Sequence, residues 1–163
     1  MFSVQNNLLF ASVLLTALIA GLFYGWACSV VPGLGRITDR EYISAMQSMN
    51  KAIINPVFML SFMGALIVLP LACYYSYSHS SITCFYLMLA AALFYIIGSF
   101  GITMACNVPL NNSLESFDLS SATAVEITQK RTSFEMPWNK YHLVRTIAAV
   151  ASLCCTILAV LKK

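Results

Sequence analysis

The feature that most constrains this chain is a long stretch without charge, because residues 52–114 contain no Asp, Glu, Lys or Arg. The water-facing surface of a soluble domain needs charged side chains to stay solvated. The stretch is long enough to cross a bilayer twice, since one helical crossing needs about 20 mostly apolar residues. Over the whole chain 60% of residues are hydrophobic and 9% are charged, against about 25% charged in a typical soluble domain. The sequence therefore predicts a multi-pass integral membrane protein.

Four apolar segments are long enough to span a membrane as helices. The first follows no Lys or Arg and exceeds the usual signal-peptide core of about 7–15 residues, so we expect it to be retained. A length of 163 residues suits one domain. We predict an all-α fold, a four-helix transmembrane bundle that forms a single domain over residues 1–163, with spans at 8–31, 57–77, 82–106 and 143–161.

The first connection is long and carries an amphipathic pattern. Thr38-x-x-Glu41 has the form of a capping box, in which each side chain satisfies an orphan backbone donor at a helix N-terminus. Apolar residues then recur at helical spacing, so we expect an amphipathic helix over residues 39–54 at the membrane surface.

The third connection, residues 107–141, is the other long hydrophilic segment. Thr123-x-x-Glu126 predicts a second short helix that reaches roughly to residue 131. We expect Pro137 to break the chain and Trp138 to open the last helix, because proline is tolerated in the first turn of a helix.

Lys and Arg gather in these two long connections, whereas only Lys162 and Lys163 belong to the opposite side. The positive-inside rule therefore places the long connections in the cytoplasm and both termini outside. The formal net charge is +3, and no basic cluster is large enough for nucleic acid, so that class of partner is excluded.

Small residues and cysteines give two further expectations. Glycines and alanines recur at close spacing on the first and third spans, which predicts close packing of helix backbones in lipid. None of the six cysteines forms a C-x-x-C pair, which argues against a thioredoxin-type motif or a zinc knuckle. Cys73 and Cys84 flank the short hairpin between the second and third spans, and their pairing stays open. The small residues that predict close helix packing are Ala17, Gly21, Gly25, Gly98, Gly101 and Ala105.

The fourth span carries a polar stripe that should face the bundle interior. Trp138, His142, Arg145, Ala149, Ser152 and Thr156 recur at three- and four-residue steps and so share one helix face. Arg145 is the most costly residue to place in a membrane, and it either snorkels to the interface or anchors an anionic group. It could also pair with Glu115, Asp118 or Glu135. His142 is either a structural histidine or a general base, for which an ordinary imidazole pKa of about 6.5 is suited.

Asparagines and aromatic residues cluster at the mouths of the other spans. Asn107 and Asn111 flank Pro109 after the third span, where they either cap the helix or form a polar lid over a cavity. Four further residues could line the same mouth, although aromatic residues at a span end are more often interface anchors. These four are Tyr24, Trp26, Asn50 and Asn55.

At these residues the chain resembles the anthrone oxygenase-like family of small four-span membrane proteins. The matching pieces are Pro32-Gly33-Leu34, Asn50 with Asn55-Pro56, Asn107-Val108-Pro109-Leu110-Asn111, and Trp138-x-x-x-His142-x-x-Arg145. The Asn-Val-Pro-Leu-Asn string is the most specific of them. The family pattern usually has Asn where this chain has His142, so the chain departs from it at a central position.

The resemblance implies an oxidoreductase, a monooxygenase that converts an anthrone to an anthraquinone with O₂ and without a metal, flavin or other cofactor. Such chemistry needs a base, oxyanion donors and a dry cavity. On this reading His142 is the base, Arg145, Asn107 and Asn111 hold the oxyanion, and Trp138 is a stacking wall. The implied partners are membrane lipid and a small lipophilic aromatic substrate or quinone.

Two alternatives remain open from the sequence. The first is a non-catalytic multi-span protein that binds a lipid, a quinone or a partner protein through the same polar mouth. The second is haem ligation through His142, although no other His or carboxylate lies four residues away. A homo-oligomeric state is also left open.

Overall fold

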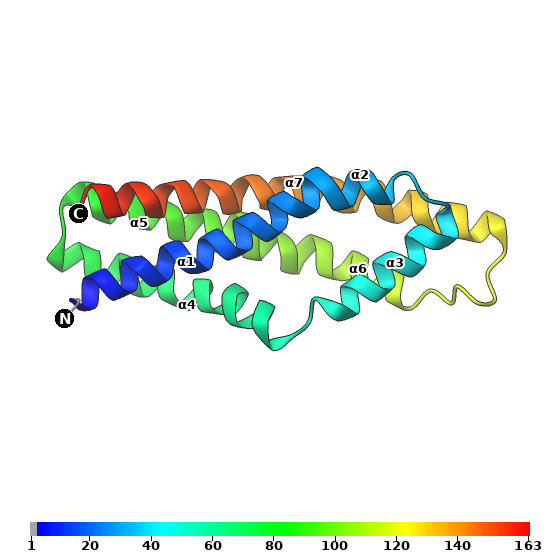
Figure 1. Cartoon of the computed structure of the whole chain (residues 1–163), viewed down its shortest axis with the longest axis horizontal. Helices are drawn as coiled ribbons and strands as arrows, with labels where there is room; N and C mark the ends of the chain where they lie inside the picture. The colour runs from blue at the N-terminus through cyan, green and yellow to red at the C-terminus, as the bar shows by residue number, and fades with distance from the viewer. Residues whose placement is uncertain (1–2) are drawn as a thin grey trace.

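The structure is a computed structural model that describes residues 3–163. It is an elongated bundle of four long helices, and both ends of the described chain lie at the same end of the bundle (Figure 1). Each of the four is long and apolar enough to cross a membrane, and the described residues contain no strand, which confirms the predicted all-α four-span architecture. The four helical segments are Val4–Leu34, Pro56–His79, Ile82–Glu115 and Ala124–Leu161.

Two of these segments change helical type along their length. The first consists of α1 (Val4–Gly25), a π-helical turn η1 (Trp26–Val30) and α2 (Val31–Leu34). The second and fourth segments are the single helices α4 (Pro56–His79) and α7 (Ala124–Leu161). The third consists of α5 (Ile82–Leu93), η2 (Phe94–Gly101), η3 (Thr103–Asn107) and α6 (Val108–Glu115).

The outer faces of the bundle are apolar and its interior holds small and polar residues. Leu18, Ile67 and Ile147 are all more than half exposed, as expected of side chains that face lipid. Inside, the Ser152 hydroxyl donates to the Ala91 carbonyl at 2.8 Å, so this buried polar group is satisfied between two helices.

A glycine permits close helix packing on the third segment, but the glycines of the first segment do not have this role. A Cβ added at Gly98 would lie 2.5 Å from the Ala148 Cβ, so only glycine fits where this segment crosses α7. A Cβ added at Gly21 or Gly25 would meet nothing within 4 Å. The expectation that these two glycines permit close packing is therefore wrong, because they do not lie at a helix crossing.

The third connection contains much more helix than we expected. The third segment continues through Pro109 to Glu115, and α7 begins at Ala124 with the predicted capping box of Thr123 and Glu126. The predicted break at Pro137 is wrong, since α7 runs through it to Leu161. Proline removes one helical hydrogen bond. Here Phe134 and Trp138 are buried on either side of Pro137, and this packing holds the helix together.

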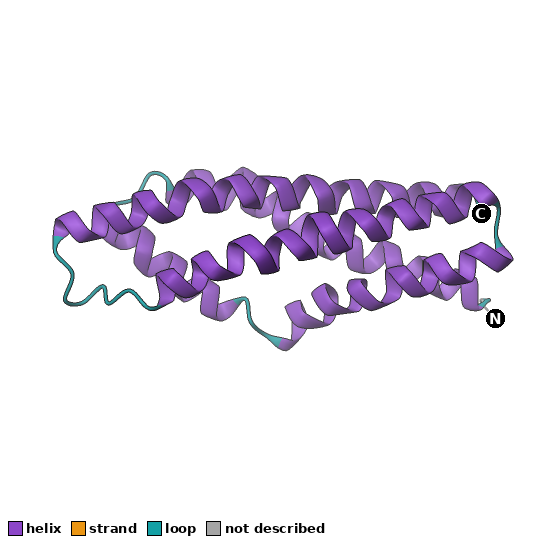
Figure 2. Ribbon diagram, turned by 180° about the vertical axis from the view of Figure 1, so that it is seen from behind, coloured by secondary structure: helices purple, strands orange, loops and turns teal. Residues whose placement is uncertain are grey.

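The first connection folds into α3 (Asp39–Ala52), which begins with the predicted capping box of Thr38 and Glu41. The helix is amphipathic as predicted, but its apolar face packs on protein rather than on the membrane surface. Tyr42, Ile43 and Met46 of α3 join a second hydrophobic core with residues of α6 and α7. We call α3 and the part of α7 before Pro137 the cap, which extends the bundle at the end opposite the termini (Figures 1 and 2).

Arg131 of α7 holds the cap together. It pairs with Asp39 of α3 at 3.0 Å and with Glu135 at 2.7 Å. Its guanidinium also donates to the Ile37 carbonyl at 2.9 Å and lies 4.5 Å from the centre of the Tyr42 ring.

At the opposite end of the bundle, Cys73 and Cys84 are buried and not bonded to each other.

Candidate functional site

A cluster of buried polar residues lies where the cap meets the bundle. It is formed by the end of α1 with η1, by η2 and η3, and by the middle of α7. The stripe on α7 faces inward as the sequence predicted, because all six of its members are buried. We call the cluster the Arg145 site; its central members are Phe23, Thr103, Asn107, Trp138, His142 and Arg145.

Arg145 lies at the centre of this site with only 9% of its surface exposed. Its Nε donates to His142 Nδ1 at 3.1 Å, and its Nη1 donates to the Thr103 hydroxyl at 3.2 Å. The guanidinium carbon lies 4.4 Å from the centre of the Phe23 ring and 5.3 Å from that of Trp138. Arg145 is thus enclosed by the bundle and does not snorkel to the interface.

No carboxylate among residues 3–163 pairs with Arg145. Glu115 instead pairs with Lys51, and Glu135 pairs with Arg131. Asp118 accepts hydrogen bonds from Ser120 and Ser121, which lower its pKa to about 2. All three carboxylates considered from the sequence are therefore engaged elsewhere. An enclosed cation without a counter-ion favours the binding of an anion.

His142 is fixed by aromatic rings on two sides. Its ring stacks on Trp138 with centroids 4.9 Å apart and planes at 18°, and it meets the Phe23 ring edge-on at 5.8 Å. Only 2% of its surface is exposed. The imidazole therefore keeps one orientation relative to Arg145.

The asparagines after the third span contact α7, as the polar-lid reading requires. The Trp138 indole N–H donates to Asn111 Oδ1 at 2.8 Å, and Asn107 Nδ2 donates to the Trp138 carbonyl at 3.3 Å. The two asparagines thus fix the position of Trp138. Neither caps a helix in the structure, since Asn107 makes no side-chain capping bond.

Several buried polar atoms at or near this site have no hydrogen-bond partner within residues 3–163. Such atoms are rare in folded proteins, where nearly all buried polar groups are satisfied. An unsatisfied group costs about 1–3 kcal/mol, so a ligand that bonds to these atoms would be stabilised. They are Trp26 Nε1, Asn50 Nδ2, Ser99 Oγ, Asn107 Oδ1 and His142 Nε2.

The π-helical turns coincide with this site. In η1 the Val31 N–H bonds to the Trp26 carbonyl, and in η3 the Val108 N–H bonds to the Thr103 carbonyl, each five residues back. In an α-helix of about 3.6 residues per turn, positions four apart drift around the axis, and wider turns offset this drift. The π-helical turns therefore help Ser99, Thr103 and Asn107 to share the buried face of the third segment.

The structure brings most of the predicted site residues together but not all of them. Trp26 lies beside Trp138, with ring centroids 6.1 Å apart, and Asn50 is on the same face of α3 as the buried Met46. Tyr24 is 62% exposed and lies on the outer surface. Asn55 caps α4 by accepting from the Phe58 N–H at 3.0 Å. Tyr24 and Asn55 are therefore outside the site.

Phe23, Ser99 and Thr103 are not among the site residues predicted from the sequence. Ser99 and Thr103 precede Asn107 and Asn111 at steps of four residues, so a polar stripe on the third span could have revealed them. Phe23 carries no such signal, because an apolar residue in an apolar span is indistinguishable from a lipid-facing one.

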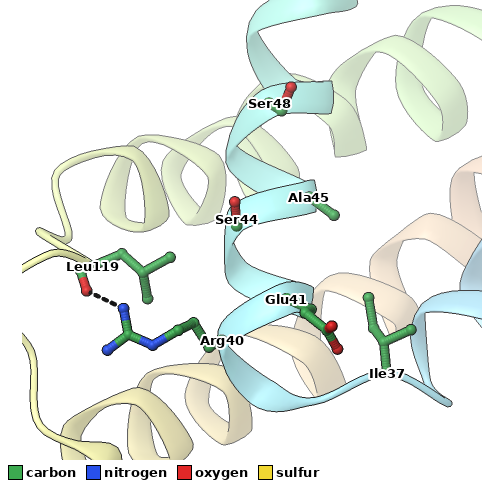
Figure 3. Close-up of a pocket in the computed structure, with 7 residues that line it drawn as sticks. All are labelled: Ile37, Arg40, Glu41, Ser44, Ala45, Ser48 and Leu119. Carbon is green, nitrogen blue, oxygen red and sulfur yellow. Dashed lines mark hydrogen bonds between the residues drawn. The ribbon is translucent and has the colours of Figure 1, made fainter.

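The structure also has two open hollows that lie away from these residues. One, of about 700 Å³, runs along α3 and is lined by Arg40, Ser44 and Leu119 among others (Figure 3). There Arg40 Nη1 donates to the Leu119 carbonyl at 2.9 Å, so the charged group is already satisfied. The other, of about 440 Å³, lies near the termini and includes Asn6 and Lys163. Neither has the unpartnered buried groups that mark the Arg145 site.

The described residues contain no group of three or more His, Cys, Asp or Glu placed to hold a metal ion. The fold and the site together define a class of protein: a four-span membrane bundle that encloses an arginine among aromatic rings, without a carboxylate partner in residues 3–163.

Residues 58–155 match the family model described as Anthrone oxygenase. The match covers more than half of the chain, and the chain therefore belongs to this family. The matched region contains Asn107, Trp138, His142 and Arg145, and it begins after Trp26 and Asn50. No curated protein and no solved structure matches the chain.

Proposed function

We propose that this protein is a membrane-embedded oxygenase that oxidises a lipophilic phenolic or anthrone-like substrate with O₂. The observation that carries the proposal is the enclosed Arg145 without a carboxylate partner in residues 3–163. A fixed cation in a low-dielectric interior stabilises developing negative charge far more than it would in water. The family supports the same direction, since its described name is Anthrone oxygenase.

The reaction balances without an added cofactor. Loss of one proton from the benzylic CH₂ of an anthrone gives an anion whose charge is delocalised onto the oxygen. The carbanionic carbon adds to O₂, and protonation gives a hydroperoxide. Loss of the second C–H proton with cleavage of the O–O bond leaves a ketone and releases water. The substrate carbon loses four electrons, and O₂ supplies the ketone oxygen and the oxygen of the water.

The residues of the site have distinct roles in this proposal. Arg145 stabilises the oxygen of the substrate anion through its remaining N–H groups. Trp138 and Phe23 provide flat apolar walls for an aromatic ring system, and Asn107 and Asn111 keep Trp138 in place. The surrounding bundle excludes water, which strengthens the electrostatic interaction and protects the anion from protonation by solvent.

The test is to purify the protein in detergent, add an anthrone, and follow quinone absorbance together with O₂ uptake, with a protein-free sample to correct for autoxidation. We expect one O₂ consumed per quinone formed. Arg145→Gln should lower kcat/KM by about 100-fold, the typical effect of removing one oxyanion donor. Lys140→Gln is the matched control, because Lys140 is exposed on the same helix and should leave the rate unchanged.

Equal rates for Arg145→Gln and the unchanged protein would overturn the proposed mechanism. Saturable binding of the anthrone without O₂ uptake would instead make the chain a binding protein for the same class of ligand. Both outcomes are read from one preparation, because ligand binding is measured by tryptophan fluorescence before O₂ is admitted.

We also propose that the cap lies in the cytoplasm and that the termini lie outside. Six of the nine Lys and Arg residues lie in the two long connections at this end of the bundle, which the positive-inside rule assigns to the cytoplasmic side. Ser44→Cys places a thiol on the exposed surface of α3. That thiol should resist a membrane-impermeant reagent in intact cells and react after lysis; labelling in intact cells would reverse the orientation.

A further inference from the structure

The hydrogen bond between Arg145 and His142 determines which imidazole nitrogen carries the proton. Arg145 Nε lies 3.1 Å from His142 Nδ1. A guanidinium nitrogen only donates, so Nδ1 must supply its lone pair and the neutral ring must carry its proton on Nε2. A doubly protonated ring would set an N–H against an N–H and two positive charges side by side in a low-dielectric interior. His142 is therefore the neutral Nε2–H tautomer.

The Nε2–H group of His142 is a buried donor without an acceptor. The backbone of Phe23 lies beside the ring, but no acceptor among residues 3–163 meets Nε2 with hydrogen-bond geometry. Since stacking on Trp138 prevents the ring from turning toward another partner, the donor remains available to a ligand.

Arg145 supplies further donors to the same site. Its Nε and Nη1 each make one hydrogen bond, and Nη2 makes none with residues 3–163. The free N–H groups of both residues need acceptor atoms, and a negatively charged acceptor also neutralises the cation. Neutral water would leave the charge uncompensated.

One buried acceptor complements these donors. Asn107 Oδ1 has no partner in the described part of the chain, and its orientation is fixed because Asn107 Nδ2 donates to the Trp138 carbonyl. Asn107 lies one helical turn beyond Thr103, which holds Arg145. A ligand hydroxyl would satisfy Asn107 Oδ1.

We infer that Arg145 and His142 form a receptor for an oxyanion, in which His142 donates through Nε2. The ligand is an ionised phenol or enolate on a flat aromatic system, and a second, un-ionised hydroxyl of the ligand donates to Asn107. The aromatic character of the ligand rests on the proposed function and on the rings of Phe23, Trp26 and Trp138 around the site. The assignment of the receptor depends only on the hydrogen bonds that Arg145 and His142 make and leave unmade.

This assignment revises the role given to His142 from the sequence. A general base needs a free lone pair, whereas the lone pair of His142 is used by Arg145. The substrate is instead recognised as its anion, and the proton that it loses goes to the aqueous buffer. His142 and Arg145 then stabilise the anion by donating hydrogen bonds.

The test uses 1,8-dihydroxyanthraquinone, a flat phenol that is already a quinone and whose colour reports ionisation. Its ionisation is titrated in detergent with and without the protein. Hydrogen bonds to a charged group contribute about 1.5–3 kcal/mol, so the anion should bind at least about tenfold more tightly than the neutral form. The apparent pKa of the bound dye should fall accordingly.

Three variants separate a donor from a base. His142→Gln keeps an N–H donor near the position of Nε2 but has no basic lone pair, and it should retain most of the preference for the anion. His142→Ala should lose part of the preference, and Arg145→Gln should lose all of it. Leu143→Ala is the control, because Leu143 is the next residue on α7 and is 55% exposed. It should change nothing.

A preference for the neutral dye, or a His142→Gln variant that behaves like His142→Ala, would overturn the inference. If a variant does not fold, ¹⁵N NMR of histidine in the unchanged protein still decides the tautomer, with His79→Gln used to assign the two signals. A signal from Nδ1–H or from the doubly protonated ring at neutral pH would refute it. A shifted dye titration without anthrone oxidation would leave the receptor in place and refute only the proposed oxygenase.

Discussion

Replacing Gly98 with alanine tests how closely the third segment must approach α7. The new Cβ would lie 2.5 Å from the Ala148 Cβ, where an ordinary contact begins at 3.4 Å, so the helices must separate by about 0.9 Å. Ala148 has no rotamer that could relieve the overlap. Overpacking of this kind destabilises by about 1–3 kcal/mol, and the higher helix propensity of alanine offsets up to about 1 kcal/mol. We expect a net loss of about 2 kcal/mol.

The free energy of unfolding in detergent, measured by titration with a denaturing detergent and followed by circular dichroism, gives this value directly. Gly21→Ala is the matched control, because a Cβ there meets nothing within 4 Å. It should be neutral or slightly stabilising. The double variant Gly98→Ala with Ala148→Gly removes the clash, and it should recover at least about 1 kcal/mol through coupling between the two sites.

The same separation should disturb the Arg145 site. Thr103 and Arg145 lie about one turn from Gly98 and Ala148, and their hydrogen bond of 3.2 Å would lengthen as the helices part. Binding of the anionic dye should therefore weaken together with stability and recover in the double variant. A Gly98→Ala protein as stable as the unchanged one, or strictly additive effects in the double variant, would refute the packing argument.

Two further predictions concern the cap. Arg131→Met removes both ion pairs of Arg131, whose side chain is only 13% exposed. It should lower the free energy of local opening of α3 by about 2 kcal/mol, measured by amide hydrogen exchange. Arg36→Met, at an exposed position, is the control, and unchanged protection of α3 in Arg131→Met would contradict the role given to Arg131. The Asp39 pKa is lowered mainly by the hydrogen bond from Thr128 and further by Arg131. Its stabilising effect is therefore present above about pH 4 and lost as the pH falls through the lower folded-state value. The protection factors of the α3 amides, which correct for the pH dependence of exchange in an unfolded chain, should fall below pH 4 in the unchanged protein. They should fall less in Asp39→Asn, where Glu41, whose pKa is also lowered by Thr38, still titrates in this range.

The sequence alone determined the number of spans and much of the local structure. A soluble domain cannot expose charge-free runs of this length to water, so four membrane helices could be predicted from composition. The capping boxes at Thr38 and Thr123 were also readable, because they depend on side chains three residues apart. The inward stripe on α7 followed from its helical spacing.

Other local rules were overridden by packing between distant parts of the chain. Pro137 signals a helix break, yet buried neighbours carry α7 through it. Spacing alone suggested close contact at Gly21 and Gly25, but a small residue permits contact only where a second helix crosses, as at Gly98. The apolar face of α3 is what a helix at a membrane surface would have, but in the structure the N-terminal part of α7 covers this face.

The chemistry of the site was decided by tertiary structure. The sequence identified Trp138, His142 and Arg145 as neighbours on one helix. It did not reveal that Arg145 has no carboxylate partner within residues 3–163, or which tautomer His142 adopts. These properties depend on which groups from α1, the third segment and the cap reach the same point in space. Hydrophobicity is a sum over residues and can be read from a chain, whereas a hydrogen-bond partner is a matter of distance and direction between atoms far apart in sequence.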